Sequence, residues 1–510
     1  PLSTLAAVAS VLAADAYAVG LRAGRRRVGL LLTSVAAYAA GLLLQESVLP
    51  LVWVFGWIAL DAPRRTPLPR RERLWPLGHL ALTCAYAAVW LSIPRTQEIT
   101  GQGFQPIVLA YLLQGVAFPL GWPLVQVGAA DWPVGMLLAA LAAGAGLLVW
   151  AAARGTSRRI ATLGALWVAS SIAPVWAGLG WDYVSVGPRL FYAAAPGVAL
   201  LFAAASPLTG RGGRRARAIW LALLVALPLA VCIRDGADQQ RLAEAAFRHQ
   251  SRAIDVMASR PGQRLLFVNY PDRLELRAKP YPLGFWGLVL APVAQNLSDY
   301  ALAGAGVRVE TESLSAAEHG WDAREASPFR VDMRGVQITH DSLRAAAERA
   351  DAVYLTEYAP DGAMRLAEVG HIGTDGGGLV ARVGERLELA NVEILPGPEA
   401  SSLVLRLAWR LRGAGAWGDT LFVHVLDGQG RWVAGADGDA LGGLLPLVAW
   451  PNGGLVVDER LLSVEGLDPG EYRVTVGAYN RDSGRRYRAV DATGAAIADG
   501  EITVATTTLP

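Results

Sequence analysis

The stretch RAGRRRVGLLLTSVAAYAAGLLLQESVLPLVWVFGWIALDAPRRTPLPRRER occupies residues 22–73, and the rest of the chain is organised around it. A largely apolar run, residues 28–60, lies between two clusters of arginine. Short arginine-rich loops stay on the cytoplasmic side of a membrane, so this run must cross an even number of times. A single helix of this length would reach roughly 50 Å, whereas a hydrocarbon core is about 30 Å thick. We therefore predict two short crossings that meet at Gln45 and Glu46, with Pro50 starting the return helix.

The composition indicates a membrane part followed by a globular part. The 510 residues are 53% hydrophobic, and the apolar spans are confined to the first 233 residues. The net charge of +2 does not indicate nucleic-acid binding, because the arginines cluster in short loops between spans. Both cysteines lie in apolar spans and the six histidines are scattered, so neither a disulfide framework nor a metal site is predicted. No cofactor is expected. A single lysine among 46 basic residues indicates a GC-rich, bacterial source.

The arginine clusters predict a topology of eight crossings with every cluster on one side. The crossings are residues 2–21, 28–44, 47–60, 75–93, 134–153, 160–178, 191–208 and 219–233. Residues 107–127 are apolar but contain two prolines, and a full crossing here would break the alternation. We predict a re-entrant or interfacial segment, which is tolerated where protein covers the broken backbone. The first 233 residues thus form a polytopic helical domain of a bacterial plasma membrane, and everything after Arg234 is external.

Two external domains are predicted after the last crossing. In residues 234–385, strand-like runs alternate with helix-like spacing, which is typical of a small α/β domain. From residue 386 to 510, short alternating runs are separated by turns such as DGQG (427–430) and PNGG (451–454). Regular short strands with Gly and Asp turns indicate an antiparallel β-sandwich.

The candidate site lies on the external membrane face, where three predicted loops meet. Its proposed substrate-binding residues are Gln45, Glu46, Arg95, Asp182, Arg189 and Tyr192. A lipid-linked anionic sugar needs a cation for its phosphate, and the planar fork of arginine makes bidentate contacts to phosphate. Arg189 is also compatible with a simple interfacial anchor, and Glu46 with a structural acid at the turn. No catalytic residue is assigned.

Two motifs resemble the GT-C superfamily of membrane glycosyltransferases, protein O-mannosyltransferases in particular. LLLQESVLPLVW (42–53) is similar to a hairpin of the type LLSKE followed by LP, with Gln45 where lysine is common and with Glu46 and Pro50 retained. GPRLFYAAAPGVALLF (187–202) resembles the stretch SRYLYLPSVGFALL, in which Arg189 and Tyr192 match an arginine and a tyrosine. The resemblance covers about residues 1–233.

The resemblance implies transfer of a sugar from a polyprenyl-phosphate donor to a protein or glycan acceptor on the external face of the cell envelope. Such enzymes take an acidic general base from their first external loop, which would precede this chain. The resemblance therefore implies that the chain is amino-terminally truncated and inactive in this form. A non-catalytic membrane anchor that displays a β-sandwich binding or adhesion module is the alternative. A transporter ranks third because the spans contain few acids and no inverted repeat is seen. The sequence does not identify the sugar or the acceptor.

Overall fold

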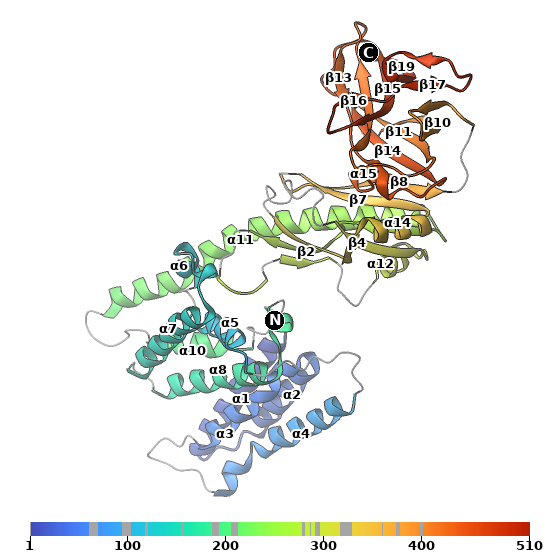
Figure 1. The fold of residues 1–510 in the computed structure, drawn as a ribbon. Helices are drawn as coiled ribbons and strands as arrows, with labels where there is room; N and C mark the ends of the chain where they lie inside the picture. The colour runs from blue at the N-terminus through green and yellow to red at the C-terminus, as the bar shows by residue number, and fades with distance from the viewer. Residues whose placement is uncertain are drawn as a thin grey trace. The chain divides into compact units, whose positions relative to one another are not determined.

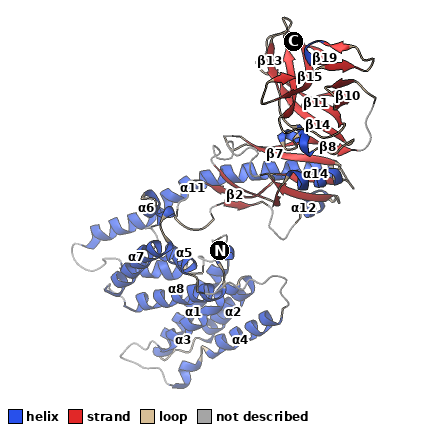
Figure 2. Ribbon diagram, in the orientation of Figure 1, coloured by secondary structure: helices blue, strands red, loops and turns tan. Residues whose placement is uncertain are grey.

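The structure is a computed structural model of the 510 residues. It describes residues 2–60, 70–93, 104–117, 121–154, 158–185, 193–205, 213–277, 281–285, 287–290, 296–316, 329–359, 361–373, 378–397 and 401–509. The chain divides into a helical unit, residues 1–237 with 278–286, and a sheet-rich unit, residues 238–277 with 287–510 (Figures 1 and 2). The predicted contrast between a helical amino-terminal half and a sheet-rich carboxyl-terminal region is therefore confirmed.

The helical unit consists of apolar helices joined by short connections. They are α1 (Leu2–Arg22), α2 (Val28–Leu44), α3 (Val52–Leu60), α4 (Leu77–Ser92), α5 (Pro106–Val116), α6 (Gly121–Gln126), α7 (Val134–Arg154), α8 (Arg158–Gly178), α9 (Trp181–Val184), α10 (Ala195–Ala205) and the first part of α11 (Gly213–Ala258), with 3₁₀ segments η1 (Glu46–Leu51), η2 (Arg70–Leu74) and η3 (Ala129–Asp131). Among the described residues, α1, α7 and α8 are long and apolar enough to cross a membrane. Shorter apolar helices include α2, α5, α10 and residues 48–60.

Helices α1, α2 and α3 form an up-down-up arrangement in which the first basic loop and the described part of the second, residues 70–73, lie at one end. The guanidinium of Arg22, at the end of α1, donates to the backbone carbonyl of Ile58 near the end of α3 over 3.2 Å. Arg26 and Glu72, one from each basic loop, form an ion pair at 2.8 Å. The run between the clusters therefore leaves this end in α2 and returns to it in α3, as a hairpin requires.

The opposite end of the bundle carries the turn of the hairpin. The hydroxyl of Ser3, at the start of α1, donates to Oε1 of Gln45 over 2.9 Å. Gln45 has an extended backbone, with φ at −167°, so α2 stops there and η1 begins. Arg159, at the start of α8, pairs with Asp15 in the second half of α1. Helix α8 thus starts toward the basic end and runs toward the end that holds Gln45.

The apolar segment 107–127 is not one helix but two. Helix α5 ends at Val116 and α6 begins at Gly121, and the prolines and glycine of this stretch account for the interruption, because proline removes a helical hydrogen bond. The amide of Gln114 on α5 makes two bonds to the backbone of Leu283, donating to its carbonyl over 3.1 Å and accepting from its N–H over 3.0 Å. The segment 281–285 therefore packs against α5, although it lies far along the chain.

Helix α11 joins two elements that the sequence predicts separately. The last crossing, 219–233, and a helix at 238–259 are continuous in the structure from Gly213 to Ala258. The linking residues RDGAD (234–238) contain no proline, and a single glycine costs a helix only about 1 kcal/mol relative to alanine. The boundary was predicted from the change to polar residues after the last crossing, but no residue of the linker ends the helix.

The sheet-rich unit contains three sheets. Its strands are β1 (Arg264–Val268), β2 (Pro271–Leu276), β3 (Gly287–Val289), β4 (Glu310–Ser315), β5 (Phe329–Met333), β6 (Val336–Gln337), β7 (Ala352–Tyr358), β8 (Met364–Gly373), β9 (Ala381–Val383), β10 (Leu387–Pro396), β11 (Ser402–Leu411), β12 (Asp419–Leu426), β13 (Trp432–Gly435), β14 (Leu455–Ser463), β15 (Gly470–Asn480), β16 (Arg485–Arg486), β17 (Ala489–Asp491), β18 (Ala496–Ile497) and β19 (Ile502–Leu509). The helices α12 (Leu297–Ala305), α14 (His340–Arg349) and α15 (Ala440–Gly443) and the 3₁₀ turns η5 (Leu447–Ala449) and η6 (Ala498–Gly500) accompany them.

One 11-stranded sheet runs through both predicted external domains. Its order is β18-β17-β9-β10-β11-β14-β8-β7-β1-β4-β6. Strands β7, β1, β4 and β6 are parallel, and the remaining pairs are antiparallel. The α/β region and the β-sandwich region thus share a sheet across β7, β8 and β14, and the boundary predicted at 385/386 falls within that sheet.

A single core joins the long sheet to the five-stranded sheet of β12, β13, β15, β16 and β19. Leu407 on β11 and Val456 on β14 face Val423 on β12 and Val476 on β15, and all four side chains are buried. Burying a side chain of this size stabilises a fold by roughly 1.5–3 kcal/mol, so the two layers hold each other in place. Helix α14 adds Leu343 to the same core.

Candidate functional site

The predicted membrane-face residues fall partly on described positions. Gln45 ends α2 and accepts from Ser3, and Glu46 is the first residue of η1, though its side chain lies outside the described part. Asp182 is exposed in α9, just beyond the end of α8, so it lies toward the same end of the helical unit as Gln45. Among the described residues, no hydrogen bond joins Gln45 to Asp182.

The other three predicted residues lie outside the described residues. Arg95 belongs to the range 94–103, and Arg189 and Tyr192 belong to the range 186–192. Their proposed contacts with a phosphate or a sugar stay predictions.

Gln105 organises the carboxyl-terminal end of α8, and the sequence analysis did not single out this residue. Its backbone carbonyl accepts from the indole N–H of Trp176 over 3.1 Å, and its Oε1 accepts from the backbone N–H of Trp181 over 3.1 Å. The ring of Trp181 meets Tyr111 of α5 edge-on, with 5.8 Å between centroids. This group links α5, α8 and α9 and holds Asp182 in place, one residue after Trp181.

A polar cluster is buried among α1, α2 and α4. The hydroxyl groups of Ser10 and Ser34 each donate to the other residue's backbone carbonyl, over 2.7 and 2.9 Å. Nε2 of His79 lies 2.9 Å from the hydroxyl of Ser34, and the hydroxyl of Tyr38 lies 2.8 Å from that of Thr83. Hydrogen bonds of this kind hold apolar helices together where water is absent. We therefore assign this cluster a structural role in packing the helices.

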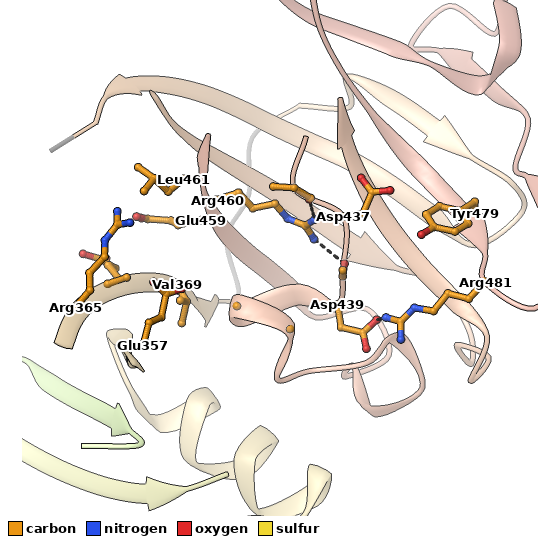
Figure 3. A pocket seen from close by; sticks show the side chains of 16 residues that line it. Glu357, Arg365, Val369, Asp437, Asp439, Glu459, Arg460, Leu461, Tyr479 and Arg481 are labelled. Carbon is orange, nitrogen blue, oxygen red and sulfur yellow. Dashed lines mark hydrogen bonds and ion pairs between the residues drawn. The ribbon is translucent and has the colours of Figure 1, made fainter. Parts of the chain in front are cut away.

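The sheet-rich unit contains a polar hollow of about 740 Å³, drawn in Figure 3. Its walls come from β7, β8, β14, β15 and the loop 436–443. They include Glu357, Arg365, Glu368, Asp437, Asp439, Glu459, Arg460, Tyr479 and Arg481. The figure shows these side chains in two groups, one around Arg365 and Glu459 and the other around Asp437, Asp439, Tyr479 and Arg481, with Arg460 between them.

A buried ion pair shapes the loop that borders the hollow. Asp458 is fully buried, accepts from Nε of Arg460 over 2.6 Å, and also accepts from the backbone N–H of Leu441 over 2.9 Å. Arg460 donates to the backbone carbonyls of Ala436 and of Gly438, the latter over 2.8 Å. Breaking a buried pair of this kind by removing one partner costs about 3–5 kcal/mol, so both ends of the loop are firmly held.

The loop itself is strained, which shows that its shape is imposed by these contacts. Leu441 is buried and has φ at +54°, a left-handed conformation that costs a non-glycine residue of order 1–3 kcal/mol. The adjoining Gly442 and Gly443 have φ at +68° and +84°, which glycine adopts freely.

Two aspartates project from this loop with defined partners. Oδ1 of Asp439 accepts from Thr420 over 3.2 Å and from the guanidinium of Arg481. The two carboxylate oxygens of Asp437 lie 3.2 and 3.3 Å from Nε2 of His424. Each carboxylate therefore has a fixed orientation.

A second carboxylate pair lies on the other side of the hollow. Burial raises the pKa of the Glu459 carboxyl, and the charge of Glu368 raises it further, whereas the hydrogen bond and charge of Arg406 lower it. Glu459 accepts from Nε of Arg406 over 2.7 Å, and Glu368 accepts from Arg260 and from the hydroxyl of Tyr354, over 2.5 and 3.1 Å. Both acids are engaged by arginine, which fits a structural role.

No metal centre is formed among the residues that the structure describes, since no three His, Cys, Asp or Glu side chains are grouped as ligands there. The hollow draws its residues from positions 357 to 481, and no short motif marks them. The pairing of β7 with β8 and of β8 with β14 brings one group of them together, and the bonds of Arg460 and Arg481 to the loop 436–443 bring the other. Comparison with models of known protein families and with curated proteins gives no match to this chain.

Proposed function

We propose that the protein is an integral-membrane glycosyltransferase that moves a sugar from a polyprenyl-phosphate donor to an acceptor on the external face. The supporting observation is the hairpin of α2, η1 and α3, with its basic loops at one end and Gln45 and Glu46 at the other. If arginine-rich loops face the cytoplasm, this turn is external, where a lipid-linked sugar would be used.

The proposed topology has eight crossings, and the carboxyl-terminal unit is external. In this arrangement Gln45, Glu46 and Asp182 contact the sugar or its phosphate, while Arg95, Arg189 and Tyr192 complete the site from neighbouring loops. Arg189 provides the bidentate cation that an anionic phosphate requires. The general base is not assigned to any residue of this chain.

The test is a transfer assay with the full-length protein in lipid nanodiscs and a labelled polyprenyl-phosphate sugar. Glu46→Gln and Arg189→Ala are expected to lower kcat/KM by about tenfold or more, since a charge-assisted contact contributes roughly 1.5–3 kcal/mol. Glu72→Gln and Arg71→Ala, at the basic end of the bundle, serve as matched controls. Unchanged transfer in both site variants would remove these residues from the site, and no transfer by the unmodified protein would contradict the proposal itself.

A membrane-anchored binding protein is the second candidate, and the polar hollow of the sheet-rich unit favours it. Under this proposal the helical unit only anchors the chain, and the hollow carries the activity. The same assay separates the two, because an anchor gives no sugar transfer with any donor.

A further inference from the structure

We propose that the hollow bordered by Asp437, Asp439, Tyr479 and Arg481 binds a neutral carbohydrate. This inference does not rest on the transferase proposal, since it concerns a site within the sheet-rich unit alone. It holds equally for an enzyme that recruits a glycan acceptor and for an anchor that displays a binding module.

The size and construction of the hollow are those of a ligand site. A volume of about 740 Å³ lies in the range of roughly 300–1,000 Å³ that small-molecule sites occupy. The bordering loop is held by Arg460 and the buried Asp458, and Leu441 keeps a strained backbone within it. Strain of this kind persists where surrounding contacts impose a shape, and here the shape displays Asp437 and Asp439.

The lining presents hydrogen-bond acceptors and donors side by side. Arg481 and Thr420 both reach Oδ1 of Asp439, and no bond to its Oδ2 is found among the described residues. The hydroxyl of Tyr479 likewise has no hydrogen-bond partner in the described part of the chain. A sugar hydroxyl donates and accepts at once, so vicinal hydroxyls can donate to the aspartate while accepting from the guanidinium.

The same lining disfavours other ligand classes. Carboxylates outnumber guanidinium groups in the lining, and Arg460 and Arg481 already pair with Asp458 and Asp439, so the hollow offers an anion little free positive charge. An apolar ligand would desolvate these charged groups without forming hydrogen bonds to them, which is costly. The carboxylates that face the hollow are not grouped as metal ligands among the described residues. Of the ligand classes considered, a neutral, polyhydroxylated ligand is the one that this lining favours. The ring of Tyr479 offers it an aromatic surface.

The test measures ligand binding to the full-length protein in nanodiscs, by saturation-transfer NMR and by titration for the affinity. The probes are the methyl glycosides of mannose, galactose, glucose and N-acetylglucosamine, with glucuronate and ethanolamine as charged probes. At least one neutral glycoside is expected to bind. Asp439→Asn is expected to weaken that binding about tenfold, the effect of losing one hydrogen bond to a charged group. Tyr479→Ala is expected to weaken it by about three- to tenfold, because it removes a neutral hydroxyl together with the ring.

Glu471→Gln, an exposed carboxylate on the same strand as Tyr479, is the matched control and should bind as the unmodified protein does. Asp437→Asn, at an exposed position of the hollow, should also weaken binding and is the variant least expected to disturb folding. Unfolding curves check each protein. Failure of every neutral glycoside to bind, binding of a charged probe alone, or unchanged affinity in folded Asp437→Asn, Asp439→Asn and Tyr479→Ala variants would overturn the proposal. Sugar transfer is not measured here, so this outcome is independent of the transferase assay.

Discussion

His249 is a buried histidine in the part of α11 that belongs to the sheet-rich unit, and it makes the stability of this unit depend on pH. Its side chain packs on Tyr270, with 5.0 Å between ring centroids, and Nε2 lies 3.4 Å from the hydroxyl of Thr356. Nδ1 has no hydrogen-bond partner among the described residues. Burial lowers the pKa of His249 from 6.5 to about 4, because the charged imidazolium is disfavoured away from water.

We expect the free energy of unfolding to fall as the pH is lowered from 6.5 to 4. In this window the unfolded chain protonates His249 while the folded chain does not, so protons favour unfolding, by up to about 3 kcal/mol at pH 4. His249→Phe should flatten this part of the profile. His340→Gln, at an exposed histidine, should leave it unchanged. Urea unfolding followed by circular dichroism checks this, and parallel curves for the unmodified protein and His249→Phe would contradict it.

Helices α8 and α10 approach each other so closely that only glycine fits at their contact. A Cβ on Gly164 would lie 2.8 Å from the carbonyl oxygen of Gly197, and a Cβ on Gly197 would lie 2.8 Å from that of Gly164. Small residues at helix contacts are typical of membrane bundles, where close backbone packing replaces the hydrophobic effect. The contact also sets the position of Ala193, whose carbonyl accepts from the indole of Trp167 over 2.8 Å.

Gly164→Ala should therefore destabilise the helical unit by about 1–3 kcal/mol, the cost of overpacking a tight contact. Gly146→Ala on α7 is the matched control, because nothing lies within 4 Å of its added Cβ. That change should be neutral or stabilise the helix by up to about 1 kcal/mol. Thermal unfolding in detergent measures both, and equal melting temperatures for the two variants would show that the α8–α10 contact is not tight in the protein.

At the scale of the whole molecule, the sidedness of the chain is the testable consequence of its arginine pattern. In a background with Cys84→Ser and Cys232→Ala, Gln429→Cys should react with a membrane-impermeant maleimide on intact cells, because residues 428–430 are exposed in a unit proposed to be external. Arg25→Cys, in the first basic loop, should react only after lysis. The reverse labelling pattern would overturn the topology and, with it, the external site.

The sequence predicts the helical elements best where apolar runs end at charged or polar residues. Helix α2 has the predicted bounds, Val28–Leu44, because arginines precede it and Gln45 follows it. Its partners could not be predicted in this way. The ion pair of Asp15 with Arg159 joins residues that are 144 positions apart, and only helix packing brings them together. Of the candidate membrane site, the sequence thus predicts that Gln45 ends a helix, but not that Ser3 contacts it.

The sequence by itself determined the division into an apolar helical half and a sheet-rich half, because hydrophobic runs and their periods are local properties of the chain. The tertiary structure alone decided that α11 is continuous, that one sheet spans the predicted α/β and β-sandwich regions, and that Asp437, Asp439, Tyr479 and Arg481 border one hollow. These features depend on strand pairing and buried ion pairs between distant residues. Hydrophobic periodicity does not identify which distant residues will be partners, so these contacts become known only from the folded chain.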